Sequence, residues 1–404
     1  MTQKATAAKK TLAKKTPPQP LGGNMHMTVA QIGGGLDSLP AKDTIAMADY
    51  LLRQNCGSVA ISSGGKYVSE LLSTGTEHFE LNLKDGRGPF GTVRMAFRLA
   101  RILRATNADI IHLRSQSLSW PVFMAAKLTN TPLVISVEDS LGAVKRAPLS
   151  LFKRADMLIS PTQPHKDGLV ALGLDAGKIT VIPPGYDSLK FDTSNTDTKK
   201  VDELWAEWDV PTATRVMYTP TMALEDSAGL HHFITALGQL RHLPFKAIIS
   251  GDYTHNRQQF TELWQQVEAT GLSKHVLFIG TPHDKVNTYA AADMIVCPQV
   301  FEPPIMRAPL HALGMGKPVV ATNLASHRAC VRHGETGWLC EPRDPQKLAS
   351  ILKDALSDNI RLHKMGGLGA KEIPKTHSYK VTCPQIHKLY QQTINQTRQQ
   401  EAQA

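Results

Sequence analysis

The segment from Val296 to Pro342 constrains the fold of this chain more than any other stretch. It begins with a short apolar run, continues through a Pro-rich loop, and then places ALGMG at helical spacing. A second apolar run, Val319 to Thr322, is followed by GETGW and a third run. This order is typical of a parallel sheet with crossover helices. Ligands of such sheets bind beyond the carboxyl ends of the strands, so we expect the chemistry in the loops Gln299 to Arg307 and Asn323 to Ser326.

The same alternation of strands and helices runs through most of the sequence. It predicts an α/β protein in which two Rossmann-like, doubly wound domains face a cleft. The first domain is expected to hold about six strands, and its pattern includes a strand at 79–83 and a helix at 90–106. The predicted divisions are a disordered basic tail, an N-terminal domain, a polar linker, a C-terminal domain and a final helix with a frayed end, at 1–24, 25–186, 187–211, 212–375 and 376–404.

Composition excludes several classes of protein. No apolar run approaches the roughly 20 residues that span a bilayer, so a soluble or peripheral protein is expected. The five cysteines are scattered and form no CxxC pair, which argues against a disulfide framework or a thiolate metal site and fits a reducing, cytoplasmic location. The sixteen histidines show no HExxH or Cys/His spacing, so no metal site is predicted.

The formal charge of +10 is concentrated at one end of the chain. Half of it comes from the five lysines Lys4, Lys9, Lys10, Lys14 and Lys15. The remainder is only mildly basic and shows no basic stripe with interleaved aromatic residues, so no nucleic-acid partner is expected.

One helix nevertheless carries a basic face. Arg94, Arg98, Arg101 and Arg104 are spaced by four, three and three residues, with Phe90 and other apolar residues nearby. Two interpretations are open. The face contacts anionic lipid at the inner face of the plasma membrane, or it is an ordinary solvated helix surface.

Several ordered motifs show a resemblance to a known family. In the second half they are the segments 250–280, 289–299, 311–322 and 333–352, which include SGDYTHNRQQF, YAAADMIVCPQ, HALGMGKPVVAT and HGETGWLCEP. In the first half they are IIHLRSQSLSW at 110–120 and VIPPGYDSLKF at 181–191. Together they resemble retaining family 4 glycosyltransferases of the GT-B fold, in a bacterial branch.

The resemblance implies a function and a set of partners. Such enzymes bind a nucleotide sugar, mostly on the C-terminal domain, and transfer the sugar without a metal or other cofactor. The acceptor is a lipid-linked saccharide or a polysaccharide, here expected to be an envelope glycolipid or polysaccharide. A donor of this kind carries two phosphates, so the protein must supply positive charge and backbone N–H groups where the glycosidic bond breaks.

The sequence departs from the family at many positions that contact the donor. Ala223 and Ala228 stand where the family has an arginine and a lysine, and His311 stands where it has a glutamate. The glycine of the loop that follows Glu302 is Met306. Further replacements are Ala325, Ser326 and Ala329 for a Gly-Gly pair and a glutamate, Leu39 and Pro40 for another Gly-Gly pair, and Glu138 for a histidine. The donor site is therefore predicted to be rebuilt or degenerate.

The residues that remain define the candidate site. The catalytic candidates are Glu302, Glu138 and Arg114, and Asp139 adds a second carboxylate beside Glu138. The candidates for donor binding are Gly34, Gly251, Asp252, Arg307, His311 and Lys317. Several have a structural alternative: a surface salt bridge for Arg114, solvated loop carboxylates for Glu138 and Asp139, a turn for Gly251 and Asp252, a capping or core role for His311, and a structural position of the family for Lys317.

Three functions are compatible with this pattern. The first is a glycosyltransferase that uses the rebuilt set. The second is a catalytically inactive GT-B protein that binds a partner enzyme or a glycan. The third and weakest is a sugar-nucleotide epimerase of the same fold, for which the sequence offers no recognisable acid–base set.

Overall fold

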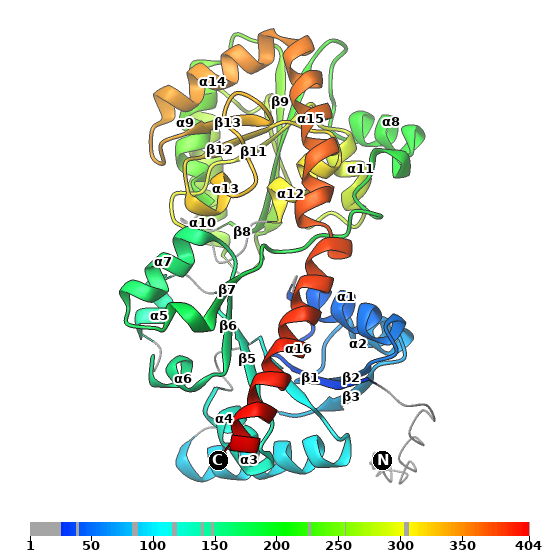
Figure 1. Ribbon diagram of the computed structural model, residues 1–404. Helices are drawn as coiled ribbons and strands as arrows, with labels where there is room; N and C mark the ends of the chain where they lie inside the picture. The colour runs from blue at the N-terminus through cyan, green and yellow to red at the C-terminus, as the bar shows by residue number, and fades with distance from the viewer. Residues whose placement is uncertain are drawn as a thin grey trace, which may run out of the picture.

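Two parallel sheets, one in each half of the chain, organise the molecule (Figure 1). The computed structural model describes residues 26–37, 40–82, 88–114, 119–138, 141–146, 149–224, 228–254, 256–302 and 307–403. The predicted disordered tail, 1–24, lies outside these residues. The expectation of a two-domain α/β protein with Rossmann-like halves is confirmed.

The N-terminal sheet has seven strands in the order β3-β2-β1-β4-β5-β6-β7, where about six were predicted, and its pairs are parallel. The central strands are short and buried on both faces, which is why they read as continuous apolar runs. β3 begins and ends earlier than predicted. The strands are β1 (Thr28–Ile32), β2 (Gly57–Ser62), β3 (Glu77–Glu80), β4 (Ile110–Leu113), β5 (Leu133–Ser136), β6 (Met157–Ser160) and β7 (Ile179–Val181).

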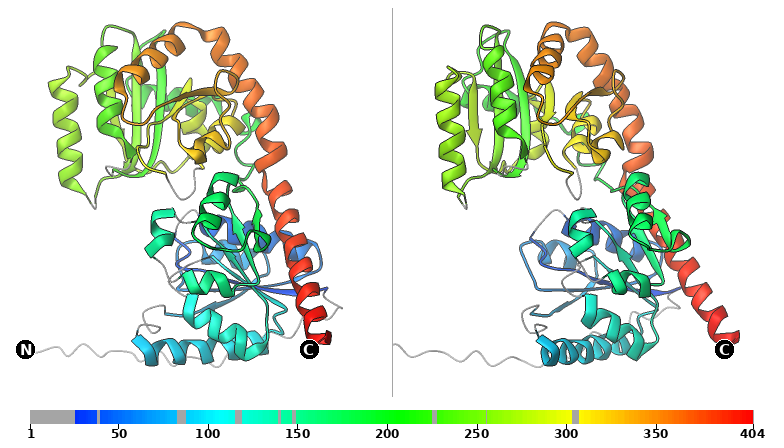
Figure 2. Two further views of the ribbon diagram at one scale, coloured as in Figure 1. Left: turned by 60° about the vertical axis from the view of Figure 1, so that its left-hand side comes forward. Right: turned by 90° about the vertical axis from the view of Figure 1, so that its left-hand side faces the viewer.

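Helices cover both faces of this sheet. α3 packs against α4 on one face, and α1 lies with α16 on the other (Figures 1 and 2). The described helices are α1 (Pro40–Arg53), α2 (Val68–Ser73), α3 (Gly88–Ala105), α4 (Ser119–Thr129), α5 (Leu141–Arg146), α6 (Leu149–Arg154) and α7 (Gln163–Ala171). The helix predicted at 90–106 therefore corresponds to α3.

The C-terminal sheet has six parallel strands in the order β10-β9-β8-β11-β12-β13. They are β8 (Arg215–Ala223), β9 (Phe245–Asp252), β10 (Val276–Ile279), β11 (Met294–Cys297), β12 (Val319–Thr322) and β13 (Gly337–Cys340). The helices between and after them are α9 (Leu230–Gln239), α10 (Arg257–Ala269), α11 (Lys285–Ala290), α12 (Ala308–Gly314), α13 (Ala325–Arg328) and α14 (Pro345–Ser357). The sequence pattern from 296 to 342 thus forms β11, α12, β12, α13 and β13.

The predicted linker, 187–211, contains structure of its own. It includes α8 (Thr198–Glu207), and Asp197 caps this helix by accepting from the backbone N–H of Lys199 at 3.0 Å. Phe191, Val201 and Trp208 are buried in the same apolar cluster as strands β8 and β11 of the C-terminal sheet. The polar appearance of the segment reflects an amphipathic helix, so the C-terminal domain begins before residue 212.

The chain crosses between the two domains twice. The first crossing follows β7, and the second joins α15 (Asn359–His377) on the C-terminal domain to α16 (Tyr379–Gln403), which runs down the N-terminal domain (Figure 2). Leu389, Tyr390 and Ile394 of α16 are buried against α1 and β1. Across the described residues, no helix combines the length and apolar character needed to traverse a bilayer.

Candidate functional site

A buried ion pair joins the two domains where the chain crosses between them. Arg307, just before α12, donates to the carboxylate of Asp43 on α1, to the carbonyl oxygen of Gly185 at 2.7 Å, and to the Tyr379 hydroxyl at 3.2 Å. Tyr379 in turn donates to Asp43 at 2.9 Å. We call Asp43, Gly185, Arg307 and Tyr379 the hinge cluster.

Arg307 was predicted to bind the donor, and the structure gives its guanidinium internal partners. The side chain is 4% exposed. Burial opposes its charged form, but the Asp43 carboxylate and Tyr379 outweigh this, so the pKa of Arg307 is raised. The guanidinium is therefore a fixed positive charge that holds the first crossing, the second crossing and α1 together.

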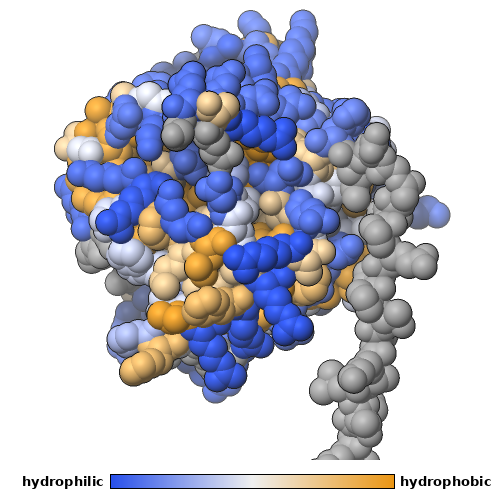
Figure 3. Space-filling view, turned by 60° about the horizontal axis from the view of Figure 1, so that its bottom comes forward, coloured by the Kyte–Doolittle hydropathy of each residue, from blue (hydrophilic) through white to orange (hydrophobic). Residues whose placement is uncertain are grey.

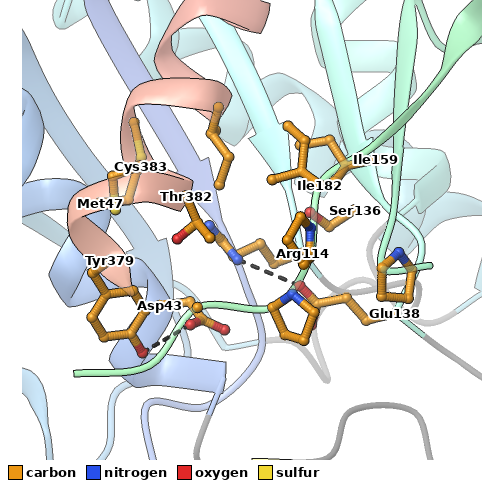
Figure 4. Close-up of a pocket in the computed structure, with 15 residues that line it drawn as sticks. Asp43, Met47, Arg114, Ser136, Glu138, Ile159, Ile182, Tyr379, Thr382 and Cys383 are labelled. Carbon is orange, nitrogen blue, oxygen red and sulfur yellow. Dashed lines mark hydrogen bonds and ion pairs between the residues drawn. The ribbon is translucent and has the colours of Figure 1, made fainter. Parts of the chain in front are cut away.

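A pocket adjoins the hinge cluster at the carboxyl ends of β4 to β6 (Figure 4). Arg114 and Glu138, two catalytic candidates, meet there with 3.4 Å between Nη1 and Oε1. The Arg114 side chain is 6% exposed, and its Nε has no hydrogen-bond partner among the described residues. Burial disfavours its charge, but Glu138 and Asp43 outweigh burial and raise the pKa of Arg114. Two predicted catalytic residues are thus adjacent, in a pocket closed on one side by α16.

A buried polar chain connects the same pocket to α16. Ser136, which lines the pocket, lies 2.8 Å from His112 Nε2, and the Tyr390 hydroxyl lies 2.6 Å from His112 Nδ1. Burial and the nearby Arg114 charge hold the pKa of His112 well below its usual value. A neutral imidazole is therefore shared between a strand hydroxyl and a helix phenol, which fixes α16 on the sheet.

Glu302, the remaining catalytic candidate, lies on the exposed edge of the C-terminal domain. Its two carboxylate oxygens accept from the backbone N–H groups of Ala325 at 2.9 Å and Ser326 at 2.6 Å. These amides begin α13, so Glu302 caps a helix that lies more than twenty residues later in the sequence. The two loops singled out in the sequence, 299–307 and 323–326, are in contact through this carboxylate.

Three donor candidates lie at or just after the carboxyl ends of strands. Gly34 follows β1, and its carbonyl oxygen accepts from the N–H of Ser63 at 3.3 Å. Gly251 and Asp252 end β9, and Asp252 accepts from the backbone N–H of Thr254 at 2.8 Å. The contact from Thr254 makes a turn after the strand, and the roles of all three in donor binding stay predictions.

His311 and Lys317 have internal contacts. The His311 ring stacks on Phe191 with centroids 3.6 Å apart, and burial, followed by Arg307 and Lys285, holds its pKa well below the usual value. Lys317 donates to the carbonyl oxygen of Ala290 at 2.8 Å, and burial lowers its pKa. Both side chains therefore pack within the C-terminal domain beside α12, which agrees with the structural roles considered for them in the sequence analysis.

Arg343 is a cation at the carboxyl edge that the sequence analysis did not single out. It follows β13 in a left-handed conformation with φ 62°, and its guanidinium lies 4.8 Å from the ring centroid of Phe301. It is also near the first turn of α9, where burial and then the Arg343 charge lower the pKa of His232. Its contact with Phe301 joins residues 42 positions apart, so no local spacing predicts it.

A second basic group lies near the junction of the domains. Lys42 and Lys66 both lie over the ring of Tyr67, at 4.1 and 5.0 Å from its centroid. Lys285, at the start of α11, has a pKa lowered by burial and then by Lys190, Lys66 and Lys42. These lysines come from both domains, which is why the sequence alone did not associate them.

The start of α9 is held tightly against the loop after β11. Gly229 adopts φ 69°, and a Cβ atom there would lie 1.9 Å from the carbonyl oxygen of Pro298. Only glycine fits, because both the backbone conformation and the space exclude a side chain. The first turn of α9, Glu302 and Arg343 consequently form one edge of the C-terminal domain, which we call the α9 edge.

Comparison with known proteins identifies the architecture. The family model described as "Glycosyltransferase Family 4" matches residues 44–188, and the one described as "Glycosyl transferases group 1" matches residues 213–358. These two ranges cover the two domains in order. The chain belongs to the family 4, group 1 glycosyltransferases.

Several proteins are similar to this chain. D-inositol 3-phosphate glycosyltransferase of Corynebacterium urealyticum is 28% identical over 245 residues, which are 58% of this chain and 56% of that relative. The chain thus spans little more than half the length of that relative. The putative glycosyltransferase YtcC of Bacillus subtilis is 21% identical over 75% of this chain and 77% of its own length.

Solved structures share the fold. A glycosyltransferase from Rickettsia africae superimposes with a TM-score of 0.84 at 22% identity, over 91% of this chain and 99% of that one. Anabaena Alr3699/HepE, solved in complex with UDP-glucose, gives a TM-score of 0.77 at 20% identity, over 91% of this chain and 100% of that one. The predicted GT-B fold is confirmed.

Some of the departures from the family pattern lie among the described residues. Ala228 is buried beside Gly229, and Ala325, Ser326 and Ala329 belong to α13 and its end. Leu39, Asp139 and Met306 lie outside the described residues, as do the side chains of Pro40 and Ala223. Whether the donor site is degenerate therefore stays a prediction.

Proposed function

We propose that this chain transfers a sugar from a nucleotide-sugar donor to a lipid-linked or polysaccharide acceptor, without a metal, at the inner face of the plasma membrane. The observation that carries the proposal is the collinear match of both domains to the two glycosyltransferase family models. The donor sites of such doubly wound domains lie at the carboxyl ends of the strands. In this chain that position in the C-terminal domain is the α9 edge.

The α9 edge offers two of the features that a diphosphate requires. Backbone N–H groups at the start of a helix favour anions, and α9 is a ten-residue helix that begins there. Arg343 adds a guanidinium over the ring of Phe301, in the loop whose residues Pro298 and Val300 pack against Gly229 at the start of that helix. The family has an arginine and a lysine where this chain has Ala223 and Ala228. We assign to Arg343 the task of neutralising the donor phosphates in their absence.

Glu302 would orient the sugar and the Arg114–Glu138 pair would act on the acceptor side. A carboxylate that accepts two backbone N–H bonds is held in one orientation, so Glu302 can also receive hydrogen bonds from sugar hydroxyls with its remaining lone pairs. Arg114 and Glu138 lie on the other domain, as acceptor-side groups should.

Calorimetric titration of the purified protein with UDP, GDP and ADP tests donor binding directly. We expect one nucleotide to bind, and Arg343→Gln to weaken that binding by roughly tenfold through the loss of a charge-assisted hydrogen bond. Arg241→Gln is the matched control, because Arg241 is exposed in the loop between α9 and β9, at the amino ends of the strands. Absence of binding to all three nucleotides would overturn the proposal.

A second candidate is a catalytically inactive GT-B protein that binds a partner or a glycan. It is favoured by the internal contacts of the predicted donor cations: Arg307 is engaged with Asp43, and Lys317 with the Ala290 carbonyl. Neither is therefore placed to replace the missing family charges. Incubation with nucleotide sugars separates the two candidates, since slow turnover abolished by Glu302→Ala or Arg114→Ala, with the fold intact, would rule out the inactive protein.

A further inference from the structure

Four lysines from both domains gather where the domains meet, beside α11 and α12. They are Lys42 on α1, Lys66 just before α2, Lys190 in the segment after β7, and Lys285 at the start of α11. We call them the junction lysines. The arginines of α3, by contrast, lie on the outer surface of the N-terminal domain, where hydrophilic and apolar groups intermingle (Figure 3). The junction lysines are instead set between two parts of the chain, so their role requires a separate explanation.

The two lysines of the N-terminal domain share one aromatic ring. Lys42 Nζ lies 4.1 Å and Lys66 Nζ lies 5.0 Å from the ring centroid of Tyr67. Lys42 also forms an ion pair with Glu70. The backbone N–H of Lys66 donates to Asp37 at 2.7 Å, whereas its ammonium has no carboxylate partner among the residues that the structure describes. Because an aromatic face attracts cations, the ring keeps two ammonium groups together although they repel each other.

The other two lysines flank the aromatic rings around α12. Lys190 precedes Phe191, whose ring stacks on His311 with centroids 3.6 Å apart. Lys285 lies four residues before Tyr289 on α11, which places both on one side of that helix. The Tyr289 ring is edge-on to His311 at 5.8 Å and to Phe191 at 6.0 Å. Contacts between these rings therefore hold Lys190 and Lys285 in the same neighbourhood.

The hinge cluster brings the two pairs of lysines together. Asp43, which follows Lys42, binds Arg307 just before α12. His311 lies one turn further along the chain, so α12 connects the contacts of the first pair to those of the second. The electrostatics agree with this placement: burial, and then the charges of the other three junction lysines, lower the pKa of Lys285.

Lys285 is half-buried without a counter-charge. Its ammonium makes no ion pair or hydrogen bond within the described part of the chain. The neighbouring Asp284 is engaged elsewhere, since it binds Lys200 at 3.3 Å and accepts from the backbone N–H of Asn287 at 3.2 Å. A buried charge costs free energy unless it is paired, and like charges nearby increase that cost. An anion bound at this place would therefore stabilise the protein.

We propose that the junction lysines bind a small ligand with adjacent phosphate groups, distinct from the sugar donor. Two linked phosphates place several negative charges close together, which suits ammonium groups that converge from different segments. The site lies apart from the α9 edge, because Lys285 follows β10 and Arg343 follows β13, and these strands form opposite edges of the C-terminal sheet. The inference does not depend on the proposed function.

Such a ligand would join the two domains. Lys42 and Lys66 belong to the N-terminal domain and Lys285 to the C-terminal domain, so a ligand held by all three is a bridge across the junction. A ligand that binds only the folded arrangement raises its stability by mass action. The junction is thus a place where a phosphorylated small molecule would fix the relative position of the domains.

Calorimetric titration and thermal unfolding of the full chain with inorganic pyrophosphate, at constant ionic strength, test the site. We expect pyrophosphate to bind and to raise the midpoint of thermal unfolding. Lys66→Gln/Lys285→Gln should weaken its binding at least about tenfold, because two charge-assisted contacts are lost. Binding should also weaken as the ionic strength is raised. Arg343→Gln should bind pyrophosphate as the unaltered chain does.

A matched control and a second readout keep the test specific. Lys127→Gln/Lys353→Gln removes one exposed lysine from each domain and changes the net charge equally, so it should bind like the unaltered chain. Without pyrophosphate, Lys285→Gln should not lower the free energy of unfolding, because it removes a half-buried charge that has no partner. A loss of stability in this variant would show a structural role for Lys285 and overturn its assignment to the site.

Three binding results would also overturn the inference. The first is an unaltered chain that does not bind pyrophosphate, and the second is a Lys66→Gln/Lys285→Gln variant that binds it as well as the control. The third is binding that Arg343→Gln abolishes and the lysine variant retains, which would assign the anion to the α9 edge. Donor binding is measured separately with nucleotides, so failure of this site and failure of the proposed function are distinguishable.

Discussion

The hinge cluster and the α9 edge use charged residues in opposite ways. At the hinge, Arg307 and Asp43 have side chains only 4% and 11% exposed, and each binds the other. At the α9 edge, Glu302 and Arg343 are exposed and contact a helix N-terminus and an aromatic ring. The hinge cluster is thus enclosed by other parts of the chain, whereas the α9 edge is open to solvent.

The difference separates residues that hold the domains from residues that can meet a ligand. A buried charge that loses its partner destabilises the fold strongly, whereas an exposed charge contributes little to stability and is free to change partners. Substitutions at the hinge should therefore change stability, and substitutions at the α9 edge should change ligand binding more than stability. Four measurements test this distinction.

The largest effect is expected for Asp43→Ala. It leaves the buried Arg307 guanidinium without its carboxylate, which should lower the free energy of unfolding by about 3–5 kcal/mol in urea titrations. Asp49→Ala is the control, because Asp49 lies on the same helix and forms an exposed pair with Arg53, worth only about 0.3–0.5 kcal/mol. Equal losses in the free energy of unfolding for the two variants would contradict the distinction between buried and exposed charges.

Acid should lower the free energy of unfolding through His377, which ends α15 and lies two residues before Tyr379 of the hinge cluster. Burial lowers the pKa of His377 from 6.5 to about 4. Between these values the unfolded chain binds more protons than the folded one, so stability is unaffected above pH 6.5 and falls as the pH drops toward 4. Within this range His377 changes the free energy of unfolding by about 1.4 kcal/mol per pH unit.

Thermal unfolding of the wild type and His377→Gln across this pH range measures that contribution. The variant should show a shallower loss of stability in acid. His363→Gln, an exposed position on the same helix, should follow the wild type. A variant at His377 that remains as acid-sensitive as the wild type would contradict the assignment.

Glu302→Ala should have a smaller effect on stability. It removes the carboxylate that caps α13, and the loss of a cap costs about 1 kcal/mol. Chemical denaturation of this variant beside Glu335→Ala, which alters an exposed surface pair with Arg332, measures the difference. A loss as large as that of Asp43→Ala would place Glu302 among the buried structural charges instead.

The smallest effect is expected for Lys200→Ala. Lys200 and Asp284 join α8 to α11 with side chains 55% and 42% exposed. Such a pair contributes at most about 1 kcal/mol, and less at high salt. Urea titrations should therefore show a small loss in the free energy of unfolding at low salt and a smaller one at high salt. A large loss that does not change with salt would contradict the link between exposure and the contribution of the pair.

The fold was predictable because most of its signals are local. Buried parallel strands such as β11 and β12 are continuous apolar runs between loops, and the observed bounds of β12, Val319–Thr322, agree with the predicted run. α8 was missed because its sequence, TKKVDELWAE, is polar on most sides and buries mainly Val201. Its burial depends on a surface supplied by other parts of the chain.

The places of the candidate residues along the strands were predictable, but their contacts were not. Sequence placed Glu302, Glu138 and Arg114 at carboxyl ends of strands, where the structure has them. It assigned Arg307 to the donor because of its place before α12, whereas its partner Asp43 is 264 residues away. Pairings over such separations are set by how the domains meet, and no spacing rule within one helix or loop reports them.

The packing of α16 on the N-terminal domain has a consequence for folding during translation. Leu389, Tyr390 and Ile394 complete the apolar cluster around β1 and α1, which are synthesised before α16. The apolar surface around β1 and α1 therefore stays uncovered until α16 has emerged from the ribosome. A nascent chain stalled before α16 should bind chaperones at that surface, and its N-terminal domain should reach the native state only after release.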